Sequence, residues 1–542
     1  MVSIVSAISL VGCVVTGSDV SEQMTRQEMG CDCTAVKPAV VPADSHREGR
    51  RGGAINIRIQ REPASLVSLN EGDPIVSNII DHTVLETLVR LSDDGKAVEP
   101  ELAERFVIDN DGNEVAFYLD EAAYWHDGRP VTASDVHFVF SKLLDPYSNL
   151  TVNAAFESVK AVNTPDESTV VFELDRYVPG FLEAVATVPI LPAHVFGRTP
   201  IPLHEASRAP IGSGPFRFVR WVPSRLIELE RNPEWRGPAP SIDQIVYHVV
   251  PDNRIALDML KTGGLDIVAD LPVGARPPEE SDVIRLTYPL PFIEAWVYNM
   301  RRPVLAEPAS RHAVAMLIDK VSLRCAVMGC LADLPDELLR ESSEQEAIFP
   351  TMPYDPDGAR RLLKESGWSD TNRDGILDRD GIPFSFSLLL PTLGRDQERA
   401  AIVIQEELAT AGIDMRISTV SRGAFFGRLI AARFDVAALS VRFSGQFDTR
   451  SLFHTPQGVT GNFGGFSNPD VDEMLDALQS ERDVSVRRDL IERIGRRLSS
   501  LQPMTFTFRP HASALYREGI GGVRFHHGWL NASALTKAQV TP

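Results

Sequence analysis

The sequence predicts a mixed α/β protein, because strand and helix patterns alternate along most of the chain. Residues 55–59 alternate apolar and polar side chains, as a strand with one buried face does. Asp355 and Pro356 mark the start of a helix, with Asp355 as its N-terminal cap and Pro356 in its first turn. Residues 397–411 show a longer helix pattern, and residues 413–417 alternate again as a strand. Such alternation is typical of sheets that helices cover on both faces.

Length and composition limit the class of protein. A chain of 542 residues is too long for one core, since domains average about 150 residues. Its hydrophobic fraction of 43% and charged fraction of 24% are ordinary for a globular protein. The formal net charge of −20 argues against nucleic acid as a partner, because phosphates would be repelled. After the first residues no apolar run reaches the roughly 18 residues of a membrane span, so none is predicted.

The first residues are similar to the export signal of a bacterial lipoprotein. Residues 1–13 are mostly apolar or small, and they end in Leu10-Val11-Gly12-Cys13, which resembles a lipobox. Cleavage before the cysteine and acylation of its thiol would anchor the chain to a membrane, so Cys13 is the predicted lipidation site. Residues 14–52 are polar and irregular and predict a flexible tether. The alternative is an irregular N-terminus with a chance cysteine.

Two of the five cysteines lie close together late in the chain. Cys325 and Cys330 flank the residues Ala-Val-Met-Gly, and in an oxidising periplasm they could form a disulfide across this short loop. Two buried thiols are the alternative. The sequence leaves both interpretations open.

A short acidic stretch has the spacing of the first part of a calcium loop. Asp370, Asn372, Asp374 and Asp378 place oxygen atoms at the positions that begin an EF-hand. Gly381 occupies the position where a bidentate glutamate is expected, so the ligand set is incomplete. An Asx-rich turn is the favoured alternative, and we expect neither a metal nor a cofactor.

Several motifs occur in the order and spacing of one protein family. The longest is the run from Trp125 to Val136, in which Asp127-Gly128 predicts a tight turn and Thr132 or Ser134 predicts a helix cap. The other matching segments are Pro100–Ala103, Ile211–Phe216, Glu230–Trp235, Tyr298–Asn299, Ile318–Lys320 and Asn462–Asp472. Together these motifs resemble the family 5 extracellular solute-binding proteins of ABC importers, the class of dipeptide-, oligopeptide- and nickel-binding proteins.

The resemblance implies a periplasmic binding protein-like fold. In that fold two mixed α/β lobes are joined by a hinge, and a small additional domain is inserted in the first lobe. We expect the first lobe to comprise residues 53–80, 205–292 and 504–542. The inserted subdomain is then expected at 81–204 and the second lobe at 293–503.

The resemblance also implies a function. The protein is expected to be the extracytoplasmic solute-binding subunit of an ABC importer, which captures a peptide-like or other small polar solute by lobe closure and delivers it to a permease. The expected partners are that solute, the ABC permease and ATPase complex, and a membrane reached through the lipid anchor. We expect a periplasmic or otherwise extracytoplasmic monomer that is no enzyme, since common catalytic motifs such as His-Glu-x-x-His are missing. The alternative is a ligand-binding sensor or scaffold lipoprotein without transport.

The first candidate ligand segment follows the first predicted strand. In oligopeptide-binding relatives this segment reaches the ligand, and here it contains two acidic residues beside a glycine. Acidic side chains in a loop can pair with a cationic or amine-bearing group, whereas the alternative is a solvated turn. The predicted ligand-binding residues are Asn70, Glu71, Gly72 and Asp73.

The second candidate ligand segment follows a strand predicted at 434–441. Peptide-binding relatives carry a tryptophan and an ammonium-binding aspartate here, and the matching positions in this chain are Arg442 and Gly445. The missing carboxylate removes a partner for an amine, while the arginine offers a planar donor to a carboxylate or phosphate. The predicted ligand-binding residues are Val441, Arg442, Phe443, Ser444, Gly445 and Asp448.

Overall fold

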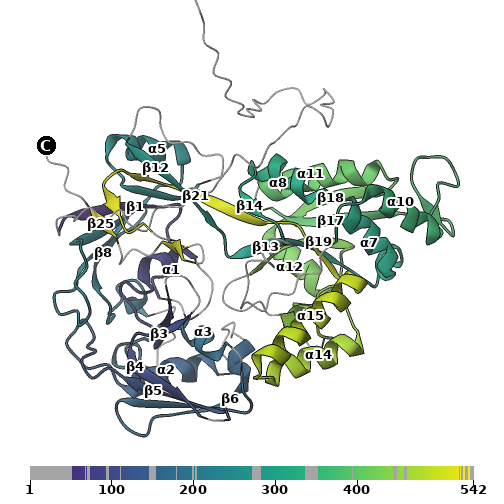
Figure 1. Ribbon diagram of the computed structural model, residues 1–542. Helices are drawn as coiled ribbons and strands as arrows, with labels where there is room; N and C mark the ends of the chain where they lie inside the picture. The colour runs from purple at the N-terminus through teal and green to yellow at the C-terminus, as the bar shows by residue number, and fades with distance from the viewer. Residues whose placement is uncertain are drawn as a thin grey trace, which may run out of the picture.

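The computed structural model has two α/β lobes side by side, with a further subdomain packed against the first (Figure 1). None of the helices in the part that it describes is long and apolar enough to cross a bilayer. The structure describes residues 52–67, 69, 74–92, 97–109, 111–145, 154–178, 180–197, 201, 204–271, 282–335, 352–392, 395–442, 449–456, 461–523, 525–526, 529–530 and 535–537.

The first lobe is built on an eight-stranded sheet with the order β12-β21-β11-β1-β10-β9-β8, to which β14 adds by pairing with β21. Strand β1 pairs in parallel with β10 and β11, whereas β21 runs antiparallel to β11 and β12. The strands are β1 (Ala54–Ile59), β8 (Phe216–Val222), β9 (Leu226–Arg231), β10 (Gln244–Val249), β11 (Ile267–Leu271), β12 (Val283–Pro289), β14 (Ala332–Asp333) and β21 (Arg509–Arg517). Smaller elements of this lobe are α1 (Pro74–Ile80), η4 (Glu205–Ser207), α5 (Asn253–Thr262), β22 (Ile520–Gly521), β23 (Phe525–His526), β24 (Trp529–Leu530) and β25 (Thr536–Lys537).

The inserted subdomain is a four-stranded sheet with the order β4-β5-β7-β6, covered by helix α2. Its core contains phenylalanines that meet edge to face, such as Phe140 against Phe172 at 4.7 Å. Helix α2 buries its apolar side against this sheet, and the buried residues of the subdomain and of the first lobe form one continuous core. Its elements are β2 (Val89–Leu91), β3 (Val98–Pro100), β4 (Ala103–Ile108), β5 (Glu114–Leu119), α2 (Ala133–Leu143), η2 (Ala154–Ser158), β6 (Val159–Asn163), β7 (Thr169–Leu174), α3 (Phe181–Val185) and α4 (Ala193–Phe196).

The second lobe is built on a five-stranded sheet with the order β18-β17-β19-β13-β20. Helices cover both faces of this sheet, and a separate hydrophobic core lies under each layer of helices. Helices α7, α8, α10 and α11 pack on one face, and α12, α14 and α15 pack on the other. The strands are β13 (Phe292–Tyr298), β17 (Ser385–Pro391), β18 (Asp414–Val420), β19 (Val436–Arg442) and β20 (Met504–Phe506). The helices are α6 (Pro303–Ala306), α7 (Pro308–Leu317), α8 (Lys320–Met328), α10 (Pro356–Glu365), α11 (Arg395–Ala409), α12 (Arg422–Ile430), α13 (Thr449–Phe453), α14 (Pro469–Ser480) and α15 (Val484–Leu501), and a short hairpin joins β15 (Asp378–Arg379) to β16 (Ile382–Pro383).

Local signals in the sequence correspond to the observed element boundaries. Asp355 caps α10, where its carboxylate accepts the Gly358 N–H at 2.8 Å. Thr132 is the N-cap of α2, and the Asp135 carboxylate accepts the Thr132 N–H at 2.9 Å. These predictions from local sequence are therefore confirmed.

Two antiparallel segments form the hinge between the lobes. The first connects β12 to β13, and the second connects β20 to β21. They are hydrogen-bonded to each other: the Leu290 N–H donates to the Pro510 carbonyl, and the Glu294 N–H donates to the Phe508 carbonyl, both at 2.9 Å. The Arg509 Nε donates to the Asp333 carboxylate at 2.6 Å, which ties β14 to the same segment. The lobes are thus joined by paired strands.

One predicted boundary differs from the strand pairing. The sequence predicts that the chain returns to the first lobe at residue 504, but β20 pairs with β13 in the sheet of the second lobe. Residues 504–506 are buried on that sheet, and the chain reaches the first lobe only with β21. A three-residue strand carries too little periodicity for its sheet to be read from sequence.

Candidate functional site

The carboxyl ends of the parallel strands gather at one edge of each sheet, and the hinge joins these two edges. Strand β12 runs parallel to β11, since both are antiparallel to β21, and it ends at Pro289. In the second lobe β17 is parallel to β18 and β19, and β13 runs antiparallel to β19, so that Phe292 begins at the edge where β19 ends. Ligands of open α/β sheets bind outside the carboxyl ends of the strands. The topology therefore indicates a site next to the hinge.

Part of the second predicted ligand segment lies at this edge. Val441 is half-buried in β19, opposite Ile293, and Arg442 is the last residue of the strand, opposite Phe292. The other predicted ligand-binding residues lie outside the described residues: Asn70, Glu71, Gly72, Asp73, Phe443, Ser444, Gly445 and Asp448. Cys13 lies outside them as well, so these assignments stay predictions.

A polar cluster that the sequence analysis missed lies at the same edge. Glu294, near the start of β13, accepts a hydrogen bond at Oε1 from the Ser440 hydroxyl at 2.9 Å and one at Oε2 from the Gln397 amide at 2.8 Å. Gln397 belongs to the first turn of α11, and its amide also reaches the Ser440 hydroxyl at 3.2 Å. The one available signal was a glutamate within the apolar strand Phe-Ile-Glu-Ala-Trp-Val-Tyr, where a charged residue is unusual.

The environment of Glu294 favours the protonated form of its carboxyl group. Burial raises the pKa of Glu294 to about 7, and the hydrogen bonds from Gln397 and Ser440 only partly oppose this effect. The negative charge of Asp396 raises it further. The cluster thus combines a half-buried carboxyl group with hydrogen-bond donors that carry no charge.

An acidic group also lies at the corresponding edge of the first lobe. Asp270, at the end of β11, has a left-handed backbone with φ of 57°, and its carboxylate accepts the Tyr288 hydroxyl at 3.0 Å. Burial raises the pKa of Asp270, although the Tyr288 hydrogen bond and the Arg58 charge oppose this. The Tyr288 ring stacks on Phe525 with centroids 3.8 Å apart. The first lobe therefore presents an acid and aromatic rings beside the hinge.

Two of the sequence motifs interlock at the boundary between the first lobe and the inserted subdomain. The His126 ring accepts the Gly212 N–H at Nδ1 at 3.2 Å, and its Nε2 contacts the Gly214 carbonyl at 3.0 Å. The same carbonyl accepts the Asn232 amide at 3.1 Å. Burial lowers the pKa of His126 to about 4, so the ring is neutral and its Nε2–H donates to Gly214. The motif around His126 therefore holds the subdomain in place.

A buried ion-pair network crosses the same boundary. Arg236 binds Glu86 through two hydrogen bonds of 2.7 and 2.8 Å and donates to Asp120 at 2.9 Å. The side chain of Glu86 is 1% exposed and that of Arg236 is 13% exposed. The two parallel hydrogen bonds of a bidentate pair fix the relative orientation of its partners. Removal of Arg236 would leave the charge of Glu86 buried without its counter-charge.

The inserted subdomain also contacts the second lobe, away from the hinge. Arg482, in the turn between α14 and α15, lies over the Tyr177 ring with its guanidinium carbon 5.0 Å from the ring centroid. Gly112, with φ of 66°, packs beneath the same ring, and a Cβ there would lie 2.6 Å from it. The two lobes are thus in contact at the hinge and through the subdomain.

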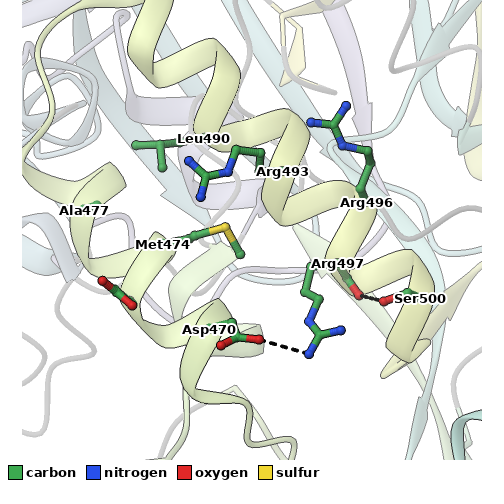
Figure 2. Close-up of a pocket in the computed structure, with 9 residues that line it drawn as sticks. Asp470, Met474, Ala477, Leu490, Arg493, Arg496, Arg497 and Ser500 are labelled. Carbon is green, nitrogen blue, oxygen red and sulfur yellow. Dashed lines mark hydrogen bonds and ion pairs between the residues drawn. The ribbon is translucent and has the colours of Figure 1, made fainter.

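A surface groove on the second lobe lies between α14 and α15 (Figure 2). Its volume is about 670 Å³. Arg497 pairs with Asp470 at 3.0 Å, and Arg493 pairs with Asp489 at 3.5 Å, so opposite charges in and beside the groove satisfy one another. Because the groove lies on helices away from the strand edges, we do not assign the ligand to it. It is lined by Asp470, Glu473, Met474, Ala477, Leu490, Arg493, Arg496, Arg497 and Ser500.

The predicted disulfide between Cys325 and Cys330 does not form. Cys330 takes part in a disulfide, but Cys325 is a thiol. Helix α8 continues through Cys325 to Met328, and Gly329 and Cys330 both have left-handed backbones with φ of 55° and 67°. The end of α8 and the turn after it, rather than a short open loop, separate the two cysteines.

The acidic stretch with calcium-loop spacing uses its oxygens as hydrogen-bond acceptors. The Asp370 carboxylate accepts the N–H groups of Asp374 at 3.1 Å and of Gly375 at 3.0 Å. Asn372 accepts the Asp374 N–H at 2.9 Å, and Asp378 accepts the Thr371 N–H at 2.9 Å. These are the contacts of an Asx-rich turn. Within the described part of the chain, no group of three or more His, Cys, Asp or Glu side chains is arranged to hold a metal ion.

Two lobes whose ligand-binding edges meet at a two-segment hinge define a solute-binding protein of the periplasmic type. The family model for bacterial extracellular solute-binding proteins, family 5, matches residues 97–482. The chain belongs to this family, which confirms the predicted family, fold and solute-binding role.

Relatives of known name are similar over most of the chain. The oligopeptide-binding protein AppA of Bacillus subtilis (strain 168) is 27% identical over 493 residues, which cover 88% of this chain and 90% of that protein. Protein XP55 of Streptomyces lividans is 26% identical and covers 76% of this chain and 75% of its own length. A probable di/tripeptide-binding protein 5 of Pseudomonas aeruginosa (strain UCBPP-PA14) is 26% identical, with 71% of this chain and 76% of its own length covered.

Solved structures share the fold. The structure of AppA from Bacillus subtilis in complex with a nonapeptide is similar with a TM-score of 0.75 and 25% identity, covering 91% of this chain and 100% of that chain. NikZ from Campylobacter jejuni in complex with Ni(L-His) has a TM-score of 0.75 at 22% identity, covering 89% of this chain and 99% of that chain. The same fold thus occurs with different ligands, and ligand identity must come from side chains.

Proposed function

We propose that this protein is the extracytoplasmic solute-binding subunit of an ABC importer and that it captures a peptide-like solute between its lobes. The observation that carries the proposal is the hinge, which joins the carboxyl edges of both sheets and so makes both lobes walls of one site. Family membership and relatives named as ABC transporter peptide-binding proteins support it. The alternative of a sensor or scaffold lipoprotein has no observation in its favour.

Lobe closure is part of this proposal. A site between two domains gains most of its contacts only when both walls engage the ligand, so ligand favours the closed arrangement. The contact of Arg482 with Tyr177 adds a second point where the lobes meet. We propose that the protein works as a monomer and that acylation at Cys13 anchors it to a membrane, as its lipobox-like sequence suggests.

The preferred ligand, on this proposal, carries a free carboxylate or another anion. Arg442 ends β19 at the ligand edge, and guanidinium pairs bidentately with carboxylate. Gly445 replaces the ammonium-binding acid of peptide-binding relatives, so a simple free amine loses its counter-charge there. The predicted first lobe includes Glu71 and Asp73 in its sequence range, and on this proposal they receive the cationic end of a zwitterionic ligand.

The first experiment identifies the ligand. Native mass spectrometry of the purified full-length protein should show a co-purifying small molecule, and adding it back at about a hundredfold excess over Kd should stabilise the protein by about 2.7 kcal/mol. Small-angle scattering should show compaction when it binds. A confirmed ligand that causes no compaction would contradict lobe closure, and turnover of that ligand would contradict a pure binding role.

The second experiment tests the anion preference. Calorimetry compares Arg442→Ala with Glu71→Ala for the identified ligand, and loss of a charged hydrogen bond should weaken binding by about tenfold or more. If Arg442→Ala binds like the parent, Arg442 does not contact the ligand. Uptake of the ligand by cells with and without this protein then separates transport from a sensing role.

A further inference from the structure

The cluster of Glu294, Gln397 and Ser440 has more hydrogen-bond acceptors than donors. The Glu294 carboxylate receives one hydrogen bond at each oxygen, although each oxygen can accept two. The Oε1 atom of Gln397 is buried and has no donor within the part of the chain that the structure describes. Buried polar atoms in proteins are nearly always hydrogen-bonded, so a buried acceptor without a donor beside a carboxylate with spare acceptor positions needs an explanation.

No charge among the described side chains balances Glu294. Among the side chains that the structure describes, no lysine, arginine or histidine forms an ion pair with it, and the one nearby charge that affects it, that of Asp396, is negative. A buried carboxylate without a counter-charge destabilises a protein unless it is protonated or paired. Its amide and hydroxyl neighbours orient the carboxylate but do not neutralise it.

The position of the cluster connects this imbalance to the ligand. Glu294 lies in the strand that leaves the hinge, and Ser440 lies opposite it in β19, just before the predicted ligand segment. Gln397 lies in the first turn of the helix that follows β17, at the same edge of the sheet. Ser440 is exposed, so the cluster can be reached from solvent.

We propose that Glu294, Gln397 and Ser440 form a subsite for a cationic group of the bound solute, either a primary ammonium or a guanidinium. Such a group supplies the two things that the cluster lacks. It brings a positive charge for Glu294 and several N–H donors for the free acceptor positions of Glu294 and Gln397. A neutral amide or hydroxyl would satisfy the hydrogen bonds but leave the carboxylate unpaired. The inference rests on the proposed function and specifies the solute chemistry of the same site.

The subsite complements the predicted role of Arg442. A solute with both charges could place its carboxylate at the end of β19 and its cation at the start of β13, since these strand ends are neighbours. Glu294 would then replace, from a different strand, the acid that is missing at Gly445. The inference thus favours zwitterionic peptides or amino-acid derivatives over purely anionic solutes.

The test uses the full-length protein and four probes: tetra-alanine with a free N-terminus, its N-acetylated form, and both forms with one alanine replaced by lysine. Calorimetry should show that Glu294→Gln weakens binding of the peptides that carry a cation by about tenfold or more and leaves the acetylated tetra-alanine unchanged. The acetylated lysine peptide distinguishes a side-chain ammonium from the N-terminus. Glu398→Gln, an exposed acid on the same helix as Gln397, serves as the matched control.

A second measurement does not depend on the choice of probe. Without ligand and above about pH 8, Glu294→Gln should melt no lower than the parent, because it removes a half-buried carboxylate that has no counter-charge among the described side chains. A lower melting temperature would show that the carboxylate is paired within the chain and would overturn the inference. The same holds if Arg442→Ala abolishes the effect of Glu294→Gln on binding, since Glu294 would then serve Arg442 rather than the solute.

The outcomes separate the inference from the proposed function. Equal affinity of the parent for acetylated tetra-alanine and for the three peptides that carry a cation would overturn the cationic subsite while leaving peptide capture intact. If the parent binds none of the four peptides, peptide capture as proposed fails, and the melting comparison alone decides whether Glu294 lacks a counter-charge.

Discussion

Protonation of His126 should loosen the junction between the first lobe and the inserted subdomain. The ring is neutral in the folded protein, because it accepts the Gly212 N–H at Nδ1 and would lose that bond if this nitrogen were protonated. Replacing it with glutamine keeps a donor and an acceptor but removes the titration. His126→Gln is therefore expected to change the pH dependence of stability more than stability itself.

The magnitude follows from the two pKa values. Burial lowers the pKa of His126 from 6.5 to about 4, so the unfolded chain binds a proton at higher pH than the folded protein does. The free energy of unfolding is therefore unaffected by this group above about pH 6.5 and falls as the pH drops from there to about pH 4. A pKa difference of about 2.5 corresponds to a loss of about 3 kcal/mol across this window.

The assay is denaturant unfolding of the parent and of His126→Gln at several values between about pH 7 and pH 4.5. Other titrating groups are common to both proteins, so the difference between the curves reports His126. His137→Gln, an exposed histidine on α2, should keep the profile of the parent. If the parent and His126→Gln lose stability in parallel as the pH falls, the ring is not held neutral and the reasoning is wrong.

Three further predictions follow from close contacts and sequence motifs. In thermal melts, Gly212→Ala should destabilise the protein by about 3 kcal/mol or more, because the new Cβ would collide with the Val84 carbonyl oxygen. The control is Gly427→Ala, which has open space around it on α12 and should stabilise the protein by about 0.5–1 kcal/mol. Equal effects of the two substitutions would contradict the packing around Gly212. In stopped-flow experiments, Tyr177→Ala should speed dissociation of an identified ligand about two- to fivefold, whereas Tyr177→Phe should not change the rate. An unchanged rate in Tyr177→Ala would rule out a role of the Tyr177–Arg482 contact in lobe closure. A fatty-acid analogue should label the native protein but not Cys13→Ser, and equal labelling of both would disprove acylation.

Sequence motifs predicted the class of protein because they record local structure. The helix cap at Asp355 and the turn at Asp127-Gly128 depend on residues that are neighbours in the chain, and both occur where the sequence places them. The short strand at 504–506 was assigned to the wrong lobe, since its sheet depends on pairing with β13, more than two hundred positions earlier. The pairing of Cys325 with Cys330 failed for a related reason, because closeness in sequence does not decide which side chains meet.

The candidate site likewise combines features that the sequence predicts with features that only the tertiary structure creates. Resemblance to a family pointed to residues near the end of β19, and the structure places Val441 and Arg442 at the edge beside the hinge. Only tertiary structure brings Glu294 within hydrogen-bonding distance of Gln397 and Ser440, which lie 103 and 146 positions away in the chain. Burial and the lack of a counter-charge give that carboxyl its chemistry, and neither is encoded by neighbouring residues. Caps, turns and strand patterns are set by local sequence, whereas the electrostatics of a site are set by whatever the fold packs around it.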